Sequence, residues 1–233
     1  MISPLAYVDA SAKLGANVTV HPFAYVDKNV EIGDDCEIMP HVSIMSGTRM
    51  GKRNRIFNGA VIAAEPQDFN YKGDDTIVEI GDDNVIRENV VINRATNSGG
   101  KTIIGNGNFL HEGVHVSHDT HIGNHSVFGY GSKISGNCMI EDYVIFGGNV
   151  LVSQGCRVGT WSMTQTGCRF RKDVPPYIVA ALEPTTYYGV NSVILMHEGM
   201  SEKIVKHISH AYRIIYQGNA SIFDALLMIK DQV

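Results

Sequence analysis

Histidine is concentrated in one stretch of this sequence, HEGVHVSHDTHIGNH, at residues 111–125. A neutral imidazole titrates near physiological pH and can take a proton from an attacking hydroxyl or amine. His118 is followed directly by Asp119, whose carboxylate could orient the ring or favour its protonated form. The pair predicts a general base of the kind that acyl transfer uses. A surface histidine with no catalytic role is the alternative.

Residues spaced eighteen apart extend this pair into a column, provided that each coil of a repeating fold takes eighteen residues. Eighteen steps beyond His118 lies Gly136, and eighteen further lies Gln154. By the same rule Asn137 stacks on Asp119. A glycine beside the imidazole exposes a main-chain N–H that could stabilise the oxyanion of a tetrahedral intermediate. We therefore expect the column to form one polar edge of the molecule.

The element that would build such a column is a six-residue repeat. A large apolar residue returns at every sixth position, which fits neither the 3.6-residue period of a helix nor the two-residue period of a strand. The repeat residues are Ile2, Val8, Leu14, Val20, Val26, Ile32, Ile38, Ile44, Met50, Ile56, Ile62, Ile80, Ile86, Ile92, Ile104, Leu110, Val116, Ile122, Phe128, Ile134, Ile140, Phe146, Val152 and Val158. This pattern is typical of a hexapeptide-repeat β-helix.

Glycines set the size of one coil. They follow the repeat residue at positions such as Gly15, Gly33 and Gly51, which lie eighteen apart. Three six-residue units therefore make one turn of a triangular prism, and glycine suits corners that need a positive φ. We predict a mainly β chain with a parallel β-helix over residues 1–177.

The repeat is interrupted twice and then ends. Residues 63–79 and 94–102 are polar excursions, and loops on a rigid solenoid often carry function. A solvated insertion without a role is the alternative for either loop. Past residue 177 we expect a small helical tail over 178–233. Within it Ser201 would begin one helix and Gly218 would end it, followed by a second helix with the sequence SIFDALLMIKDQ.

Composition excludes several function classes. The formal charge is −5 and no basic run exists, which argues against a nucleic-acid partner. No apolar stretch approaches a membrane span, and the repeat begins at Ile2 without a secretory signal. We therefore expect a cytoplasmic protein without stable membrane insertion.

The four cysteines occupy equivalent positions in the repeat. Cys36, Cys138, Cys156 and Cys168 each lie two residues before a repeat position, a slot that takes small apolar side chains. We predict reduced, inward-facing packing residues. A disulfide between Cys138 and Cys156, which stack eighteen apart, is conceivable, but a cytosolic setting disfavours it.

A metal site is the rival interpretation of the histidines. Trimeric repeat-fold hydratases bind zinc with three histidines from two chains. Here His115 and His121 both precede a repeat position and point outward, but they lie on adjacent faces, so a third ligand would have to come from another subunit. There is no CxxC pair. We expect neither a metal nor a cofactor.

Several motifs in this order resemble the UDP-N-acetylglucosamine O-acyltransferase family of lipid A biosynthesis. They are VHVSHDTHIG around His118, the loop PQDFNYKGDDT, Ser135-Gly136, the segment DVPPYIVA and the later Gly189-Val190-Asn191. The resemblance runs over essentially the whole chain. It implies a left-handed β-helix, a homotrimer with active sites between neighbouring prisms, and an acyl-carrier-protein thioester as acyl donor.

The resemblance also implies roles for individual residues. His118 would be the general base on a sugar hydroxyl, Asp119 its support and Gly136 the donor that polarises the thioester carbonyl. Gln67 and Asp68 in the first loop would help hold the sugar acceptor, and other residues would line the acceptor and nucleotide site. These other residues are His115, Asn137, Gln154 and Asn191. Thr166 occupies the position expected to limit acyl-chain length.

This sequence departs from the family pattern where the nucleotide would be held. The family typically carries a basic run after Gly-Val-Asn, whereas this chain has SVILMHEG, with His197 and Glu198 where arginines are expected. A glutamate repels a pyrophosphate. Asn70, Asn137 and Ser153 also replace residues usual in the family. A redirected homologue that acylates another acceptor, or a non-catalytic binding scaffold, is therefore a second hypothesis.

Overall fold

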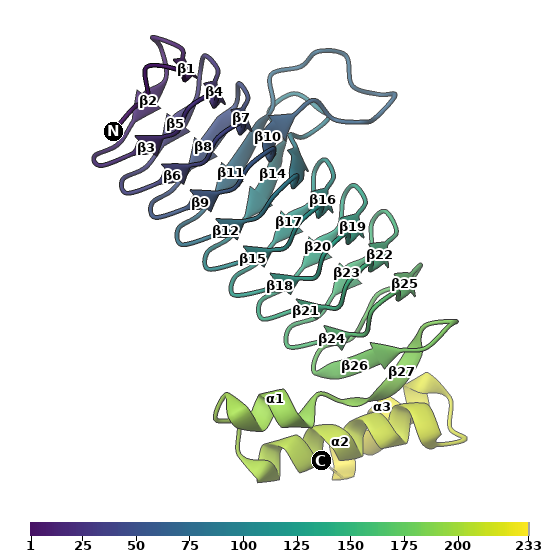
Figure 1. Cartoon of the computed structure of the whole chain (residues 1–233). Helices are drawn as coiled ribbons and strands as arrows, with labels where there is room; N and C mark the ends of the chain where they lie inside the picture. Colours follow the sequence, from purple (N-terminus) through teal and green to yellow (C-terminus); the bar gives the residue numbers. More distant parts are fainter. Residues whose placement is uncertain (233) are drawn as a thin grey trace.

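The six-residue repeat forms a left-handed parallel β-helix with three sheets, and a short helical segment covers its C-terminal end (Figure 1). The computed structural model describes residues 1–232. Most strands are only two residues long, with the repeat residue second and buried, as in β4 (Tyr25–Val26). The outward residue precedes it. The predicted fold class is confirmed.

Each coil contributes one strand to each sheet, in chain order sheet 1, sheet 2, sheet 3. Sheet 1 contains β1 (Tyr7–Val8), β4, β7 (Ser43–Ile44), β10 (Val61–Ala64), β13 (Val91–Asn93), β16 (His115–Val116), β19 (Lys133–Ile134), β22 (Leu151–Val152) and β25 (Arg169–Phe170). Sheet 2 contains β2 (Lys13–Leu14), β5 (Glu31–Ile32), β8 (Thr48–Met50), β11 (Ile77–Ile80), β14 (Lys101–Ile104), β17 (His121–Ile122), β20 (Met139–Ile140) and β23 (Arg157–Val158). Sheet 3 contains β3 (Thr19–Val20), β6 (Glu37–Ile38), β9 (Arg55–Ile56), β12 (Val85–Ile86), β15 (Phe109–Leu110), β18 (Val127–Phe128), β21 (Ile145–Phe146), β24 (Met163–Thr164), β26 (Ile178–Ala181) and β27 (Thr186–Val190).

The register makes eighteen residues equal to one coil, as predicted. His115 pairs with Lys133, and Lys133 pairs with Leu151. Where a loop intervenes the offset grows: Val61 pairs with Val91, thirty residues on, and Val91 pairs with His115, twenty-four on. The loops therefore add twelve and six residues to the eighteen of a plain coil. Both additions are multiples of six, which keeps the repeat in phase.

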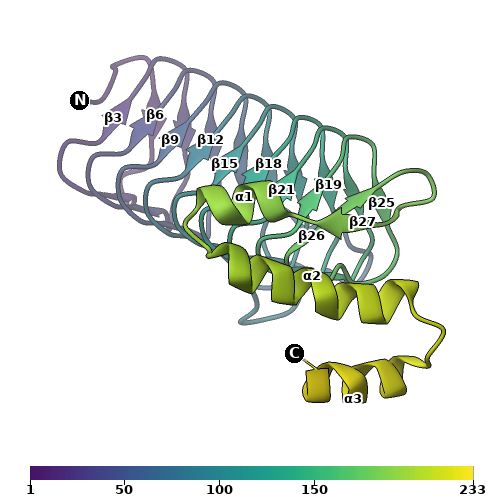
Figure 2. The ribbon, with the colours of Figure 1, turned by 90° about the horizontal axis from the view of Figure 1, so that it is seen from below.

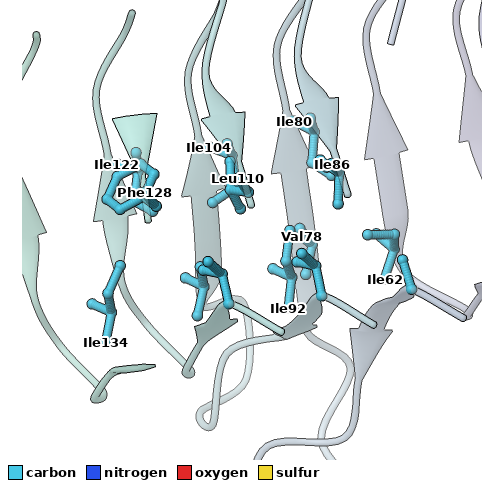
Figure 3. Packing of buried hydrophobic residues seen from close by; sticks show 14 of the residues in the cluster. Ile62, Val78, Ile80, Ile86, Ile92, Ile104, Leu110, Ile122, Phe128 and Ile134 are labelled. Atoms are coloured by element: carbon cyan, nitrogen blue, oxygen red, sulfur yellow. The ribbon is translucent and has the colours of Figure 1, made fainter. Parts of the chain in front are cut away.

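The repeat side chains stack into one continuous core along the prism axis. Ile62, Ile86, Ile92 and Leu110 have no exposed surface, and Figure 3 shows such residues in rows along the coils. Burying each of these side chains stabilises the fold by about 1.5–3 kcal/mol. The prism is thus a rigid support for groups on its outer edges.

The three corners of the prism have different contents. We call the corner between sheets 1 and 2 edge 1–2, the next edge 2–3, and the last edge 3–1. Both interruptions leave at edge 1–2, because one follows β10 and the other follows β13 of sheet 1. The long one is the loop between β10 and β11 in Figure 1.

The loops are shorter than the sequence pattern indicated. Strands β10 and β11 extend to Ala64 and back to Ile77, leaving residues 65–76 rather than 63–79. Strand β14 begins at Lys101, leaving 94–100 rather than 94–102. These flanking residues continue the ladder, as Val78 pairs with Thr102. The six-residue apolar repeat alone could not reveal that pairing.

From the sequence we expected a helical region over 178–233, but this region begins with two strands, β26 and β27. Strand β26 adds to sheet 3 in parallel with β24, and β27 returns antiparallel to it. The helices are α1 (Ser192–His197), α2 (Glu202–Gln217) and α3 (Ile222–Gln232), which lie at the C-terminal end of the prism in Figure 1 and are seen from below in Figure 2. Ser201 caps α2 by accepting the Ile204 N–H, and Gly218 follows its last residue, as predicted. Residues 1–232 contain no helix that is both long enough and apolar enough to span a membrane.

The four cysteines are buried and free, as predicted. The Cys138 thiol donates to the Ser153 carbonyl at 3.2 Å, and the Cys36 thiol donates to the Gly51 carbonyl at 3.1 Å. Burial raises the pKa of Cys138 to about 11. These thiols fill the interior of the coil corners.

Candidate active site

Edge 1–2 gathers the chemistry-bearing residues of three successive coils. Residues 65–76, 94–100 and 117–120 each follow a strand of sheet 1, so they lie one above another. The corner at 117–120 turns at Asp119, which has a φ of 57°. That left-handed conformation is uncommon for a residue with a side chain, although Asp tolerates it better than most. The turn brings the Asp119 carboxylate back to the preceding side chain.

His118 and Asp119 form a hydrogen-bonded pair. The His118 Nδ1 lies 2.8 Å from the Asp119 Oδ2, and the His118 side chain is only 8% exposed. The Asp119 N–H in turn donates to the Thr102 Oγ1 at 2.9 Å, which fixes the corner. Because a carboxylate accepts at Nδ1, the neutral ring carries its proton there and presents an unprotonated Nε2. That is the tautomer a general base needs.

A second carboxylate faces the other nitrogen of the ring. The Asp68 Oδ2, from the 65–76 loop, lies 3.7 Å from the His118 Nε2, which is too long for a hydrogen bond. The Asp68 Oδ1 accepts the Asn70 main-chain N–H at 2.9 Å. That bond, helped by the Thr96 hydroxyl and by the nearby His118, lowers the pKa of Asp68. The imidazole is therefore flanked by two carboxylates.

Thr96 connects these two carboxylates and was missed at the sequence level. Its main-chain N–H donates to the Asp119 Oδ2 at 3.1 Å, and its hydroxyl donates to the Asp68 Oδ2 at 3.2 Å. The residue is buried in the 94–100 loop. No spacing rule could have found it, because the loops break the eighteen-residue register on which the column was built.

Gly136 packs directly against the imidazole, as the eighteen-residue step predicts. A Cβ at this position would lie 2.4 Å from the His118 Cε1 and 2.5 Å from its Nε2, so any larger residue would displace the imidazole. Within residues 1–232 the Gly136 N–H makes no hydrogen bond, whereas those of Ser135 and Asn137 donate to main-chain carbonyls. The residue that packs against the imidazole thus has a main-chain N–H without a partner.

His115 occupies a half-buried position on the outer face of sheet 1. Its Nε2 lies 2.6 Å from the Asn93 Oδ1, while the Asn93 Nδ2 donates to the Glu65 carbonyl. The Asn93 amide oxygen therefore accepts from the imidazole. Burial lowers the pKa of His115, and the positive Lys133 lowers it further. His115 is held neutral.

The remaining predicted site residues divide between edges. Gln67, Asn137 and Gln154 are exposed and lie on edge 1–2 with His118. Thr166 lies on edge 3–1, after β24 of sheet 3. Asn191 is buried at the start of α1, and its Nδ2 donates to the Trp161 carbonyl on edge 2–3. One chain therefore does not bring Thr166 or Asn191 to His118.

The segment that departs from the family pattern lies beside Asn191. His197 and Glu198 pair at 3.0 Å, are exposed, and border a groove of about 670 Å³. The stacked rings of His125, Tyr143 and Trp161 form the wall of edge 2–3 in this groove. Nowhere in residues 1–232 do three or more His, Cys, Asp or Glu side chains come together in a way that could hold a metal ion.

Comparisons with known proteins agree with this geometry. A protein-family model described as Udp N-acetylglucosamine O-acyltransferase, Domain 2, matches residues 173–233, and one for bacterial transferase hexapeptide repeats matches residues 101–136. The acyl-[acyl-carrier-protein]--UDP-N-acetylglucosamine O-acyltransferase of Xanthomonas axonopodis pv. citri is 43% identical over 234 residues, covering 100% of this chain and 89% of that protein. The namesake from Myxococcus xanthus is 38% identical over 187 residues, covering 80% of this chain and 72% of that protein.

Solved structures give the same result. The crystal structure of LpxA, a UDP-N-acetylglucosamine acyltransferase from Bacteroides fragilis, has a TM-score of 0.99 and 51% identity, and the match covers 100% of this chain and 91% of that one. LpxA from Acinetobacter baumannii has a TM-score of 0.96 and 32% identity, over 100% and 90% of the two chains. A hexapeptide-repeat prism with a buried His-Asp pair, matched over its whole length by such relatives, belongs to the UDP-N-acetylglucosamine O-acyltransferase family, and the chain is an O-acyltransferase of that family.

Proposed function

We propose that this enzyme transfers an acyl group from the thioester of an acyl carrier protein to the 3-hydroxyl, or an amine at that position, of a UDP-N-acetylglucosamine-like sugar. This is an early step of lipid A biosynthesis. The relatives' names give the substrate class. The observation that carries the proposal is a buried imidazole with Nδ1 on Asp119, packed against Gly136, whose main-chain N–H has no partner within residues 1–232.

In the proposed mechanism, the acceptor hydroxyl donates to the His118 Nε2 from one side, because the 3.7 Å between Nε2 and the Asp68 Oδ2 is too short to hold another atom in line. As the hydroxyl oxygen attacks the thioester carbon, its proton moves to Nε2, and Asp119 stabilises the resulting imidazolium. The Gly136 N–H stabilises the oxyanion of the tetrahedral intermediate. The C–S bond then breaks, and the imidazolium returns the proton to the sulfur, which leaves as a thiol.

Neighbouring polar groups would hold the acceptor. Gln67 and Asp68 would bind the sugar from the loop side, while Asn137 and Gln154 extend the edge away from it. His115, neutral and hydrogen-bonded to Asn93, would offer its other nitrogen without placing a positive charge beside the base. No metal and no cofactor enters this scheme.

We also propose a homotrimer. Thr166 and Asn191 lie on edges 3–1 and 2–3, so they could serve His118 only across a boundary between chains. An apolar stripe on the outer face of sheet 3 supports such a boundary, because its side chains remain partly exposed to solvent in a single chain. The stripe consists of Val85, Phe109, Val127, Ile145 and Met163. Sedimentation should give three times the monomer mass. A cytoplasmic location, the compartment of its proposed donor, completes the assignment.

The test is an assay with acyl carrier protein charged with acyl chains of several lengths and UDP-N-acetylglucosamine as acceptor. Mass spectrometry should detect the acylated nucleotide sugar. His118→Ala should lower turnover on any accepted substrate by about a hundredfold or more. Full turnover by this variant would remove His118 as the base, and the absence of product with this acceptor would overturn the acceptor assignment.

A redirected acceptor is the second candidate. The His197–Glu198 pair, exposed where the family typically has cations, favours it. Calorimetry separates the two: micromolar binding of UDP-N-acetylglucosamine supports the family acceptor, and no binding at millimolar ligand supports another one.

A further inference from the structure

Thr96 touches both carboxylates that flank the imidazole, through two different groups. Its main-chain N–H donates to Asp119, and its hydroxyl donates to Asp68. It is 2% exposed, and its neighbour Ala95 has no exposed surface, so the position is rigidly packed. The two bonds are chemically separable, because a substitution of the side chain leaves the N–H in place.

The hydroxyl bond matters because of what Asp68 would otherwise do. The two Asn70 donors both bind the Asp68 Oδ1. Among residues 1–232, the Thr96 hydroxyl is the one hydrogen-bond donor to the Oδ2, the oxygen that lies 3.7 Å from the His118 Nε2. Without that bond, rotation of the carboxylate would let Oδ2 close the gap. A direct contact between a carboxylate and a protonated imidazole is a strong, charge-assisted hydrogen bond.

We propose that Thr96 is a positioning residue that holds the Asp68 Oδ2 beyond hydrogen-bond distance of the His118 Nε2. The Nε2 is then left unblocked and can accept the proton of the acceptor hydroxyl. This inference rests on the proposed function, since it assigns the Nε2 to the acceptor hydroxyl. Thr96 itself does not touch the reacting atoms.

Removing the Thr96 hydroxyl should favour the protonated form of the His118 imidazole. The titratable and charged groups around His118 are Asp119 on its own corner, Asp68 on the loop, and His115 with Lys133 on sheet 1. Of these, only Asp68 loses a restraint when the Thr96 hydroxyl is removed. A closer carboxylate favours the imidazolium, so a higher pH is needed to free the base. The acidic limb of the kcat/KM profile should therefore move to higher pH.

The experiment compares Thr96→Val, which is isosteric but lacks the hydroxyl, with Thr96→Ser, which keeps it. The control is Thr76→Val at the end of the 65–76 loop, which carries Asp68, because Thr76 is 4% exposed and its hydroxyl has no partner within residues 1–232. For Thr96→Val we expect kcat/KM to fall about tenfold, largely through the KM of the acceptor, with the acidic limb moved up in pH. Thr96→Ser and Thr76→Val should behave like the wild type. An unshifted limb in Thr96→Val would overturn the inference, as would a Ser variant as impaired as Val.

A second readout does not depend on activity. NMR titration of the His118 imidazole in the substrate-free protein should show protonation persisting to higher pH in Thr96→Val, and the difference should vanish in an Asp68→Asn background. Equal titration curves would refute the positioning role even if folding were perturbed. If His118→Ala keeps its turnover, the proposed function fails. If His118→Ala is inactive while Thr96→Val matches the wild type in both readouts, only the present inference fails.

Discussion

Two edges of the same prism use polar side chains in opposite ways. On edge 2–3, carboxylate and amide oxygens accept hydrogen bonds from main-chain N–H groups of the preceding coil. These side chains therefore stabilise the fold. The accepting residues are Asp34, Asp82, Asn106, Asn124 and Asp142. On edge 1–2, the His118 Nε2, the Gly136 N–H and the Gln154 side chain make no hydrogen bond within residues 1–232. Both edges are built from the same coils. The reaction site differs from the structural ladder because its polar groups have no hydrogen-bond partner in the fold.

The glycines of the two edges show the same difference. On edge 2–3 a Cβ at Gly33 would strike the Gly51 carbonyl group of the next coil, so glycine is needed for stacking. On edge 1–2 a Cβ at Gly136 would strike the His118 ring instead. Gly33 therefore allows two coils to stack, whereas Gly136 leaves space for the His118 imidazole.

Deleting one histidine from each edge should give the largest contrast. His118→Ala should reduce kcat by about 10²–10⁴-fold, the usual contribution of a positioned base. His125, on edge 2–3, has a φ of 55° and stacks on Tyr143, so Asn is its mildest replacement, because Asn tolerates that conformation. His125→Asn should keep kcat within about twofold of the wild type. A loss at His125 as large as that at His118 would show that both edges serve the reaction.

Gly136→Ala should have the next largest effect. Its φ is not positive, so the backbone tolerates alanine, and the methyl group must push the imidazole aside. We expect kcat to fall about 10- to 100-fold with the melting temperature little changed. Gly189→Ala is the matched control, because a Cβ there meets no atom within 4 Å. Steady-state kinetics and thermal melting of both variants decide, and an unaffected kcat in Gly136→Ala would argue against a contact with the reacting group.

The sequence allowed more of edge 2–3 and of the plain coils to be predicted than of the loops. Eighteen-residue stacking correctly placed Gly136 beside His118, because no loop separates these coils. Across the two loops the spacing between stacked residues grows to thirty and twenty-four, which keeps the six-residue repeat in phase but breaks the eighteen-residue step. The approach of Asp68 and the bridge by Thr96 depend on how two irregular segments fold back, for which spacing offers no rule.

The C-terminal region shows the same limit. Helix α2 can be predicted from the sequence, because a capping serine precedes it and its apolar residues recur with a helical period. Helix α1 has only six residues, too few for such a period to show. Pro175 and Pro176 precede the β26–β27 hairpin, and the predicted β-helix ended at residue 177, yet Val179 is in register with Met163. Tertiary pairing there overrides the local signal.

Removing a side-chain amide that the fold uses should give the opposite result to the one expected for His118→Ala. The Asn84 side chain accepts the Asn108 N–H and donates to the Gly105 carbonyl inside edge 2–3. Asn84→Ala leaves both groups buried and unpaired, so the free energy of unfolding should fall by about 3 kcal/mol, with kcat of the folded enzyme unchanged. Gln154→Ala on edge 1–2 is exposed and should do the opposite, weakening activity without changing stability. Urea unfolding with parallel kinetics measures both, and equal destabilisation by the two variants would erase the distinction between the edges.

The smallest expected effect concerns the buried thiols on the inner side of each edge, and it tests whether the two edges also differ in their interior packing. Cys36 on edge 2–3 and Cys138 on edge 1–2 fill the same inward slot, and burial raises the pKa of both thiols, that of Cys138 to about 11 from an ordinary value of 9.0. The folded protein therefore holds these protons more tightly than the unfolded chain. The resulting stability is complete below pH 9 and is lost as the pH rises toward 11, by about 2 kcal/mol for Cys138. In denaturant titrations at pH 8 and pH 10.5, Cys138→Ala and Cys36→Ala should each flatten this decline, and iodoacetamide at pH 8.5 should label neither thiol of the folded wild type. Rapid labelling of Cys138 alone would mean that the corner beneath the reaction site opens, so that the two edges differ in mobility and not only in their outward polar groups.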